Sequence, residues 1–491
     1  MPRHKNRIIL SILILAFAIA QTAIPTHADT QPEQIILPVP YNSQGVPEEK
    51  YLVVPFEFED LPATRSIEEL RSITVDAIQA YYDEVSYGKI RVVGDIISKW
   101  IKMPYSVQKL KLFQYNFDSN DMWKIDNAAT ELMNQLVKDT TLYSTKFIVY
   151  AGQVWGHARP SIKTTFVNEF SASGTYAHEL GHVLGLPDLY SYIAAQQGQY
   201  SQANVGPWDL MSTSSRLVHF CSWSKLKLEW ISSEQTVEGK RQGIYVVDAI
   251  ENRTGKTLVV RIRLNEVQTY YVEVREYLGV DTAVAARGVL ILFVDGRLDP
   301  KEGGVKVIDA HPNSYGGSRE LFDAPFSITP PESVTSVGID AMPSMIDKGN
   351  DLSVIVLKKI GYSYKIVVSD VAMGEKAIEA NNIIIKSGET AISRAKGELR
   401  LKGLDEAQNQ LSKAKEAYSQ AQFTDAIKAT KLAVELADSA THVPPVVSTV
   451  VVTTRTETTT TIDTIFPIVA ALAATVLILA FLARKRQAHS H

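Results

Sequence analysis

One sequence motif requires a helix at residues 178–182, where the chain reads His178-Glu179-Leu180-Gly181-His182. Two histidines four residues apart project from one face of a helix, so both imidazoles can reach a single metal ion. Glu179 lies between them and can take a proton from a metal-bound water without being a ligand. Independent residue frequencies give a chance match in roughly one such chain in a hundred. The sequence therefore predicts a catalytic metal site on a helix.

The residues after this motif predict a third ligand. Gly185 permits a tight reversal of the backbone, Pro187 cannot continue the helix, and Asp188 follows at the position where a ligand is needed. Asp188 could alternatively be only a polar residue that ends the helix. With His178 and His182 it would hold a tetrahedral zinc ion and leave one position open for water, as catalytic zinc sites do. Zn²⁺ is the predicted cofactor.

Two apolar runs predict export and anchoring. Basic residues precede the 13-residue run Ile8–Ala20, and small residues follow near position 28, so we expect a signal peptide at 1–28. An uncleaved N-terminal anchor is the alternative. The 19-residue run Ile465–Ala483 has spanning length and precedes three basic residues. We expect a transmembrane helix at 464–483, a basic cytoplasmic tail at 484–491 and a single-pass protein of the cell membrane with its ectodomain outside. A buried core helix is the alternative for the C-terminal run.

Charge and cysteine content exclude other classes. The chain has 50 Lys and Arg against 54 Asp and Glu, a formal net charge of −4. Six of the basic residues lie in the two terminal segments, which leaves the middle of the chain at about −10. We therefore expect no nucleic-acid partner. Cys221 is the single cysteine, so no disulfide can form within the chain.

Between its ends the chain predicts an α+β organisation. Residues 29–235 mix strand-like and helix-like segments, and residues 236–370 alternate apolar and polar side chains as an antiparallel β-rich domain does. Residues 371–441 have the Ala-rich spacing of a small helical hairpin or bundle, and the Thr-rich residues 442–463 predict a stalk. We expect the helical unit to be a spacer, with contact to a partner or self-association as the alternative.

The sequence resembles the immune inhibitor A family of secreted zinc metallopeptidases. Four separate motifs carry the resemblance, which covers residues 50–370: Tyr81–Lys89, His178–Asp188, Gly206–Ser212 and His219–Lys225. The family implies a zincin fold for residues 29–235, with the active-site helix across the floor of a cleft. It also implies that Met211 lies in a structural turn beneath the metal.

We therefore predict a membrane-anchored extracellular zinc metalloendopeptidase that cleaves protein or peptide substrates, with Glu179 as general base. A second group must stabilise the oxyanion. Tyr190 and His219 are weak candidates because they flank the metal motif and the Met211 turn, although each could be structural. The alternative function is a non-catalytic zincin-like adhesin or envelope-layer protein, which the presence of base, ligands and turn together disfavours.

A calcium ion is a weaker expectation. Asp295, Asp299 and Asp309 lie in predicted loops and offer the oxygen ligands that Ca²⁺ prefers. No calcium-loop spacing accompanies them, so the sequence supplies no motif for this ion.

Overall fold

The computed structural model describes residues 35–36, 46–110, 119–154, 157–159, 163–191, 204–312, 314, 317–331 and 339–443. All elements named below belong to one compact unit, Met1–Thr441. Helices and three β-sheets occur together, which confirms the predicted mixture of α and β structure. No helix among these described residues is both long enough and apolar enough to cross a membrane. The predicted signal peptide, transmembrane helix and tail lie outside the described residues, as does the predicted stalk beyond Val443.

The first sheet is mostly parallel and has the strand order β1-β3-β2-β5-β7-β6, with β4 paired to β2. Strands β3, β2, β5 and β7 run parallel, whereas the edge strands β1 and β6 are antiparallel to their neighbours. The strands are β1 (Ile35–Ile36), β2 (Glu48–Phe58), β3 (Arg91–Ile97), β4 (Ile101–Met103), β5 (Thr145–Tyr150), β6 (His157–Arg159) and β7 (Thr164–Asn168).

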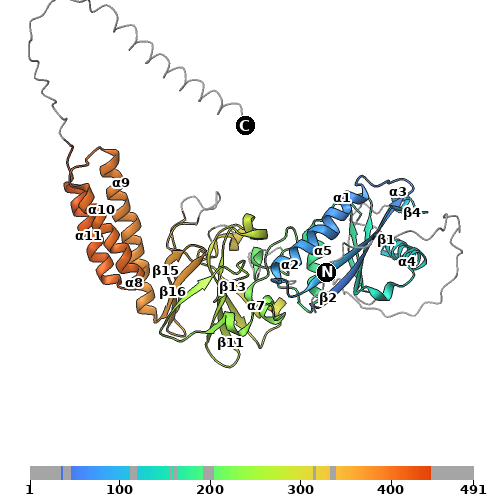
Figure 1. The fold of residues 1–491 in the computed structure, drawn as a ribbon, viewed down its shortest axis with the longest axis horizontal. Helices are drawn as coiled ribbons and strands as arrows, with labels where there is room; N and C mark the ends of the chain where they lie inside the picture. The colour runs from blue at the N-terminus through green and yellow to red at the C-terminus, as the bar shows by residue number, and fades with distance from the viewer. Residues whose placement is uncertain are drawn as a thin grey trace, which may run out of the picture. The chain divides into compact units, whose positions relative to one another are not determined.

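Helices cover both faces of this sheet (Figure 1). One continuous helical segment comprises α1 (Ile67–Arg71), a π-helical turn (Ser72–Asp76) and α2 (Ala77–Val85), and it shares a core with α5 (Ser173–Val183). Helix α4 (Ser119–Leu136) and the short α3 (Val107–Leu110) pack on the other face. Strand β2 serves both cores, because Tyr51 and Val53 enter the first and Leu52 and Val54 the second. Burial on both faces explains why β2 is apolar without interruption from Tyr51 to Phe56.

Two further sheets form a β-sandwich. The five-stranded sheet has the order β13-β12-β11-β10-β8 and the four-stranded sheet the order β14-β15-β16-β9; every pair is antiparallel except β8 with β10. Apolar residues of both sheets share one core. The strands are β8 (Thr236–Glu238), β9 (Gly243–Asp248), β10 (Val259–Arg263), β11 (Gln268–Arg275), β12 (Gly288–Asp295), β13 (Val305–Ile308), β14 (Ser344–Asp347), β15 (Leu352–Ile360) and β16 (Ser363–Ser369).

Short helices join these sheets. Helix α7 (Ser222–Lys227) precedes β8, and several other connections contain 3₁₀ turns. The 3₁₀ turns are Thr140–Leu142, Gly206–Trp208, Ser233–Gln235, Gly279–Ala283, Pro300–Glu302 and Gly317–Asp323.

The C-terminal helices pack on the outer face of the four-stranded sheet (Figure 1). Helix α8 (Val371–Asn382), a π-helical segment (Ile383–Glu389) and α9 (Thr390–Gly397) follow one another directly, and α10 (Leu404–Ser419) and α11 (Phe423–Ser439) complete the group. Alanines such as Ala414, Ala426 and Ala433 are fully buried. Their small side chains let the helix backbones approach closely. On β15, Ile355 and Leu357 pack against these helices while Val354 and Val356 enter the sandwich core.

A buried arginine connects the sandwich to the first part of the chain. Arg275 on β11 is fully buried, and its guanidinium donates to the backbone carbonyls of Trp208 (2.9 Å) and His219 (3.3 Å). The same group pairs with the carboxylates of Asp281 and Glu273. A guanidinium carries five N–H donors in one plane, so it can bond to several carboxylates and carbonyls at once. The segment around Trp208 is therefore held by a residue of the β-sandwich.

Replacing this arginine should destabilise the whole unit. In Arg275→Met the carboxylates of Asp281 and Glu273 would be buried without their cation, so we expect the free energy of unfolding to fall by about 3–5 kcal/mol. Urea unfolding followed by tryptophan fluorescence measures the change. Arg263→Met, at an exposed position on β10, is the matched control and should change stability little. An Arg275→Met protein as stable as the control would contradict this role.

Candidate active site

Helix α5 presents the predicted site residues on the side opposite its core-facing residues. Tyr176, Ala177 and Leu180 are fully buried in the core shared with the first sheet. His178, Glu179 and His182 line a cleft instead, as expected for residues that follow the helical period. Tyr82 of α2 holds the helix, because it donates its hydroxyl to the carbonyl of Ala177 (2.6 Å).

A Schellman motif ends α5 and returns the chain toward the histidines. Gly185 adopts φ +97°, its N–H donates to His182 O (3.0 Å), and the N–H of Leu186 donates to Gly181 O (3.0 Å). The left-handed conformation favours glycine at this position, as the sequence predicted. The reversal brings Asp188 back over the helix, where its Oδ1 lies 3.1 Å from His178 Nε2 and 3.2 Å from His182 Nε2.

Backbone carbonyls fix the tautomers of both histidines. Nδ1 of His178 lies 3.0 Å from Leu210 O, and Nδ1 of His182 lies 2.9 Å from Leu186 O. A carbonyl only accepts, so Nδ1 carries the proton in each ring and the Nε2 lone pair of the neutral imidazole points to Asp188. Partners of this kind orient histidine ligands in metal sites. The sequence motif alone shows neither of these two hydrogen bonds.

The donor set fits a zinc ion. Two imidazole nitrogens and one carboxylate oxygen lie within 4.8 Å of one another. Zinc bonds to such atoms are about 2.1 Å long, which puts tetrahedral ligands roughly 3.4 Å apart. The distances of 3.1 and 3.2 Å from Asp188 to the two rings are close to that value. Two neutral lone pairs facing one carboxylate would repel, and a bound cation removes that conflict.

Electrostatics at His182 also favours positive charge. Burial lowers the pKa of His182, but the hydrogen bonds to Asp188 and to the carbonyl of Leu186 outweigh it, so the pKa of His182 is raised overall. A proton and a metal ion would compete for the same Nε2 lone pair. The carboxylate of Asp188 that favours a proton on His182 would favour a metal cation at the same place.

The Met211 turn lies directly against α5. A Cβ atom at Gly181 would be only 2.5 Å from Met211 Sδ, and Met211 is fully buried. Asp209 shapes the turn by accepting from the N–H of Met211 (2.7 Å) and from the N–H of Cys221 (2.8 Å). Because Leu210 is part of the same turn, these contacts also set the carbonyl that orients His178.

The cleft beside the histidines has a volume of about 750 Å³. Its other wall is formed at the start of β5 and β7, by Thr145, Thr164 and Thr165. Glu179 also lines the cleft, but its carboxylate does not belong to the group of possible ligands formed by the two histidines and Asp188. The predicted base and the three predicted ligands therefore face one cavity.

Of the two oxyanion candidates, Tyr190 lies in this cleft. Its ring stacks on His178, with ring centroids 6.4 Å apart and planes inclined by 30°. The structure therefore brings Tyr190 together with the predicted ligands.

His219 as an oxyanion stabiliser was the wrong interpretation. Its side chain is fully buried, with Nε2 3.1 Å from Glu84 Oε1 and Nδ1 3.0 Å from Lys225 Nζ. Burial lowers the pKa of Lys225 to about 7 and that of His219 well below its usual range. Both ring nitrogens are engaged inside the protein, so no ring atom of His219 is left for a substrate. It acts as a structural residue between α2 and α7.

The residues considered for calcium have other partners. Asp295 pairs with Arg297 (2.5 Å), and Asp299 caps the 3₁₀ turn at Pro300–Glu302. Asp309 joins His311 and Asp323 in a second histidine and aspartate group. His311 directs Nδ1 to the carbonyl of Asp323 (2.7 Å) and Nε2 to that of Asp340 (2.9 Å), so both ring nitrogens face carbonyl oxygens in this conformation.

The site combines two histidines and a glutamate on one helix, an aspartate returned by a glycine turn, and a buried methionine beneath them. This arrangement is typical of metallopeptidase centres. Residues 161–224 match the family described as "Immune inhibitor A peptidase M6, catalytic domain", which confirms the resemblance predicted from the motifs. The enzyme class follows from that match: a metallopeptidase, a hydrolase acting on peptide bonds.

Other comparisons add little. A crystal structure of wild-type OgpA from Akkermansia muciniphila is 13% identical in sequence, with a TM-score of 0.26, over 54% of this chain and 91% of that chain. No curated protein matches the sequence.

Removing one histidine should empty the metal site. In His182→Ala the chain would keep only one imidazole and one carboxylate ligand, too few for a stable zinc site. We expect the purified protein to hold well below one zinc per chain by inductively coupled plasma mass spectrometry. His442→Ala, at an exposed position outside the site, is the control and should hold as much zinc as the unmodified chain. Equal zinc in both variants would exclude His182 as a ligand.

Proposed function

We propose that this chain is a membrane-anchored extracellular zinc metalloendopeptidase, with His178, His182 and Asp188 as the zinc ligands. The observation that carries the proposal is the convergence of three ligand atoms on one point beside Glu179, in a cleft large enough for part of a peptide. The match to a peptidase catalytic domain over residues 161–224 supports the reaction.

The chemistry is divided between the ion and the protein. A zinc ion held by these ligands would polarise the scissile carbonyl and lower the pKa of its water toward about 7. Glu179 then accepts the proton of the attacking water and passes it to the leaving amine. The carbonyls of Leu186 and Leu210 keep both imidazoles in the tautomer that the reaction needs.

Tyr190 is our candidate for the second oxyanion stabiliser. Its ring lies in the cleft and stacks on the ring of His178, which supports this role. A phenolic O–H donates one hydrogen bond, which is what a developing oxyanion requires.

We also propose a zincin arrangement for residues 29–235. Four features support it: a mixed sheet, a helix that carries the histidines, a following aspartate and a buried methionine turn against the helix. Residues 236–370 and 371–441 follow as β-rich and helical parts.

Anchoring in the cell membrane is proposed from the sequence. The predicted signal peptide at 1–28 and the apolar run Ile465–Ala483 would place the catalytic unit outside and the basic tail at 484–491 in the cytoplasm.

A non-catalytic adhesin is the rival function. An adhesin has no use for a carboxylate base beside a metal or for histidines held in the ligand tautomer. Both features are intact in this protein.

Replacing the base tests the mechanism. Glu179→Gln keeps the size of the side chain but cannot accept a proton, so kcat/KM on casein should fall at least about a hundredfold while zinc content stays at one per chain. Glu131→Gln, exposed on α4, should leave both unchanged. A Glu179→Gln enzyme with full activity would rule out this base.

Removing the anchor tests the topology. A chain that lacks residues 465–491 should appear in the culture medium as a soluble, chelator-sensitive peptidase, because no spanning segment would follow the stalk. Fractionation and zymography of medium and membranes measure the outcome. Continued association with membranes would contradict a C-terminal anchor.

A further inference from the structure

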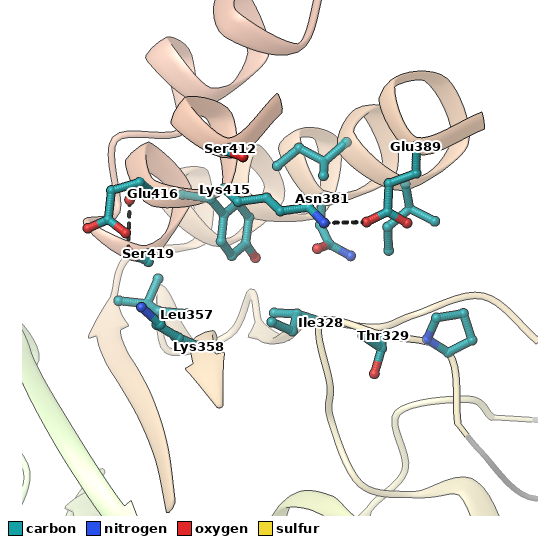
Figure 2. Close-up of a pocket in the computed structure, with 14 residues that line it drawn as sticks. Ile328, Thr329, Leu357, Lys358, Asn381, Glu389, Ser412, Lys415, Glu416 and Ser419 are labelled. Carbon is teal, nitrogen blue, oxygen red and sulfur yellow. Dashed lines mark hydrogen bonds and ion pairs between the residues drawn. The ribbon is translucent and has the colours of Figure 1, made fainter. Parts of the chain in front are cut away.

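A second cavity lies between the C-terminal helices and the β-sandwich, apart from the residues of the zinc site. It has a volume of about 390 Å³, and Figure 2 shows its walls. The end of α8, the π-helical segment 383–389 and α10 line one side, and β15 and the segment Ile328–Pro330 line the other. Cavities of this size are typical of small-molecule sites in proteins.

One polar group in this cavity lacks a partner. Asn381 is only 3% exposed, and its Nδ2 makes no hydrogen bond within the part of the chain that the structure describes. Figure 2 shows the amide directed from the helices toward Ile328 and Thr329. A buried N–H₂ without an acceptor is unfavourable, and native proteins seldom retain one without a ligand or water. The amide is thus a donor available to a bound molecule.

Several of the other polar groups at the cavity pair with one another. Lys415 pairs with Glu389 (2.6 Å), and Ser419 donates to the carbonyl of Glu416 (2.8 Å). With Lys358 and Glu416 also present, the lining carries two basic and two acidic side chains and has no net charge. The cavity therefore has no preference for an anion or a cation.

The rest of the lining is mainly apolar, and it includes part of a π-helical segment. Ile328, Leu357, Ile384 and Tyr418 supply apolar surface. Ile384 belongs to the π-helical segment Ile383–Glu389, which follows Asn381 at the end of α8. π-helical turns are uncommon and occur frequently at functional sites, because the wider turn re-aims side chains at some cost in stability.

From these observations we infer that this cavity binds an uncharged, mainly apolar small molecule that carries one carbonyl oxygen, such as an aliphatic amide, ketone or ester. The carbonyl would accept from Asn381 Nδ2, and the apolar part would replace water against Ile328, Leu357 and Tyr418. The inference does not depend on the zinc site.

Calorimetric titration of the zinc-loaded full-length chain tests this inference. Hexanamide is the neutral probe, and hexanoate has the same tail with a charge that a lining of zero net charge does not compensate. We expect hexanamide to bind with a dissociation constant in the millimolar range or lower, and hexanoate to bind at least about tenfold more weakly. Absence of hexanamide binding, or preference for hexanoate, would overturn the proposed ligand class.

Two variants locate the probe. Asn381→Leu removes the donor at similar size and should weaken hexanamide about three- to tenfold, whereas Asn382→Leu, the neighbouring residue outside the cavity lining, should not. Ser412→Trp adds bulk at an exposed position on the cavity rim and should block binding. Lys413→Trp adds the same bulk one residue away, outside the lining, and is the control that should still bind hexanamide. Undiminished binding to Asn381→Leu or to Ser412→Trp would show that the probe binds elsewhere.

A capped peptide separates a free small molecule from a peptide segment. N-acetyl-Leu-Leu-amide offers the same carbonyl chemistry on a larger apolar body. We expect it to bind more weakly than hexanamide, because its additional peptide groups would be buried against apolar walls without partners. Tighter binding of the peptide, lost in Ser412→Trp, would show that the cavity is a peptide site and that the small-molecule assignment is wrong.

Discussion

Two backbone carbonyls, those of Leu186 and Leu210, determine what the cleft can bind. Each accepts from Nδ1 of one histidine and leaves the Nε2 lone pair directed at Asp188. With the opposite tautomer, both rings would donate to Asp188 and no metal could enter. The proposed metal site therefore depends on peptide groups whose positions are set elsewhere in the fold.

Support for those carbonyls comes from distant parts of the chain. The Leu186 carbonyl is placed by the Schellman turn at Gly185, whereas the Leu210 carbonyl is placed by Asp209 and by the close contact between Met211 and Gly181. Arg275 from the β-sandwich holds Trp208, one residue before Asp209. The sandwich thus contributes directly to the shape of the active site, and α5 alone would not form it.

The sequence predicted the parts of this site that local rules govern. Helical periodicity placed His178 and His182 on one face, and Gly185 with Pro187 indicated the turn that returns Asp188. Long-range contacts could not be predicted from the sequence, because no local pattern shows that Arg275 contacts Trp208, 67 residues away in the chain. His219 was misread for the same reason: its neighbours in sequence suggested the cleft, but Glu84 and Lys225 enclose its ring. The mixed α and β character followed from periodicity, whereas the order of strands in the three sheets did not.

The central claim is that two imidazoles and one carboxylate hold a zinc ion beside Glu179. The zinc K-edge X-ray absorption spectrum of the purified full-length chain tests this claim most directly. We expect a first shell of nitrogen and oxygen only, at about 2.0–2.1 Å, with the outer-shell scattering of two imidazole rings. A sulfur shell near 2.3 Å, which would implicate Cys221, or a spectrum without imidazole scattering would contradict it.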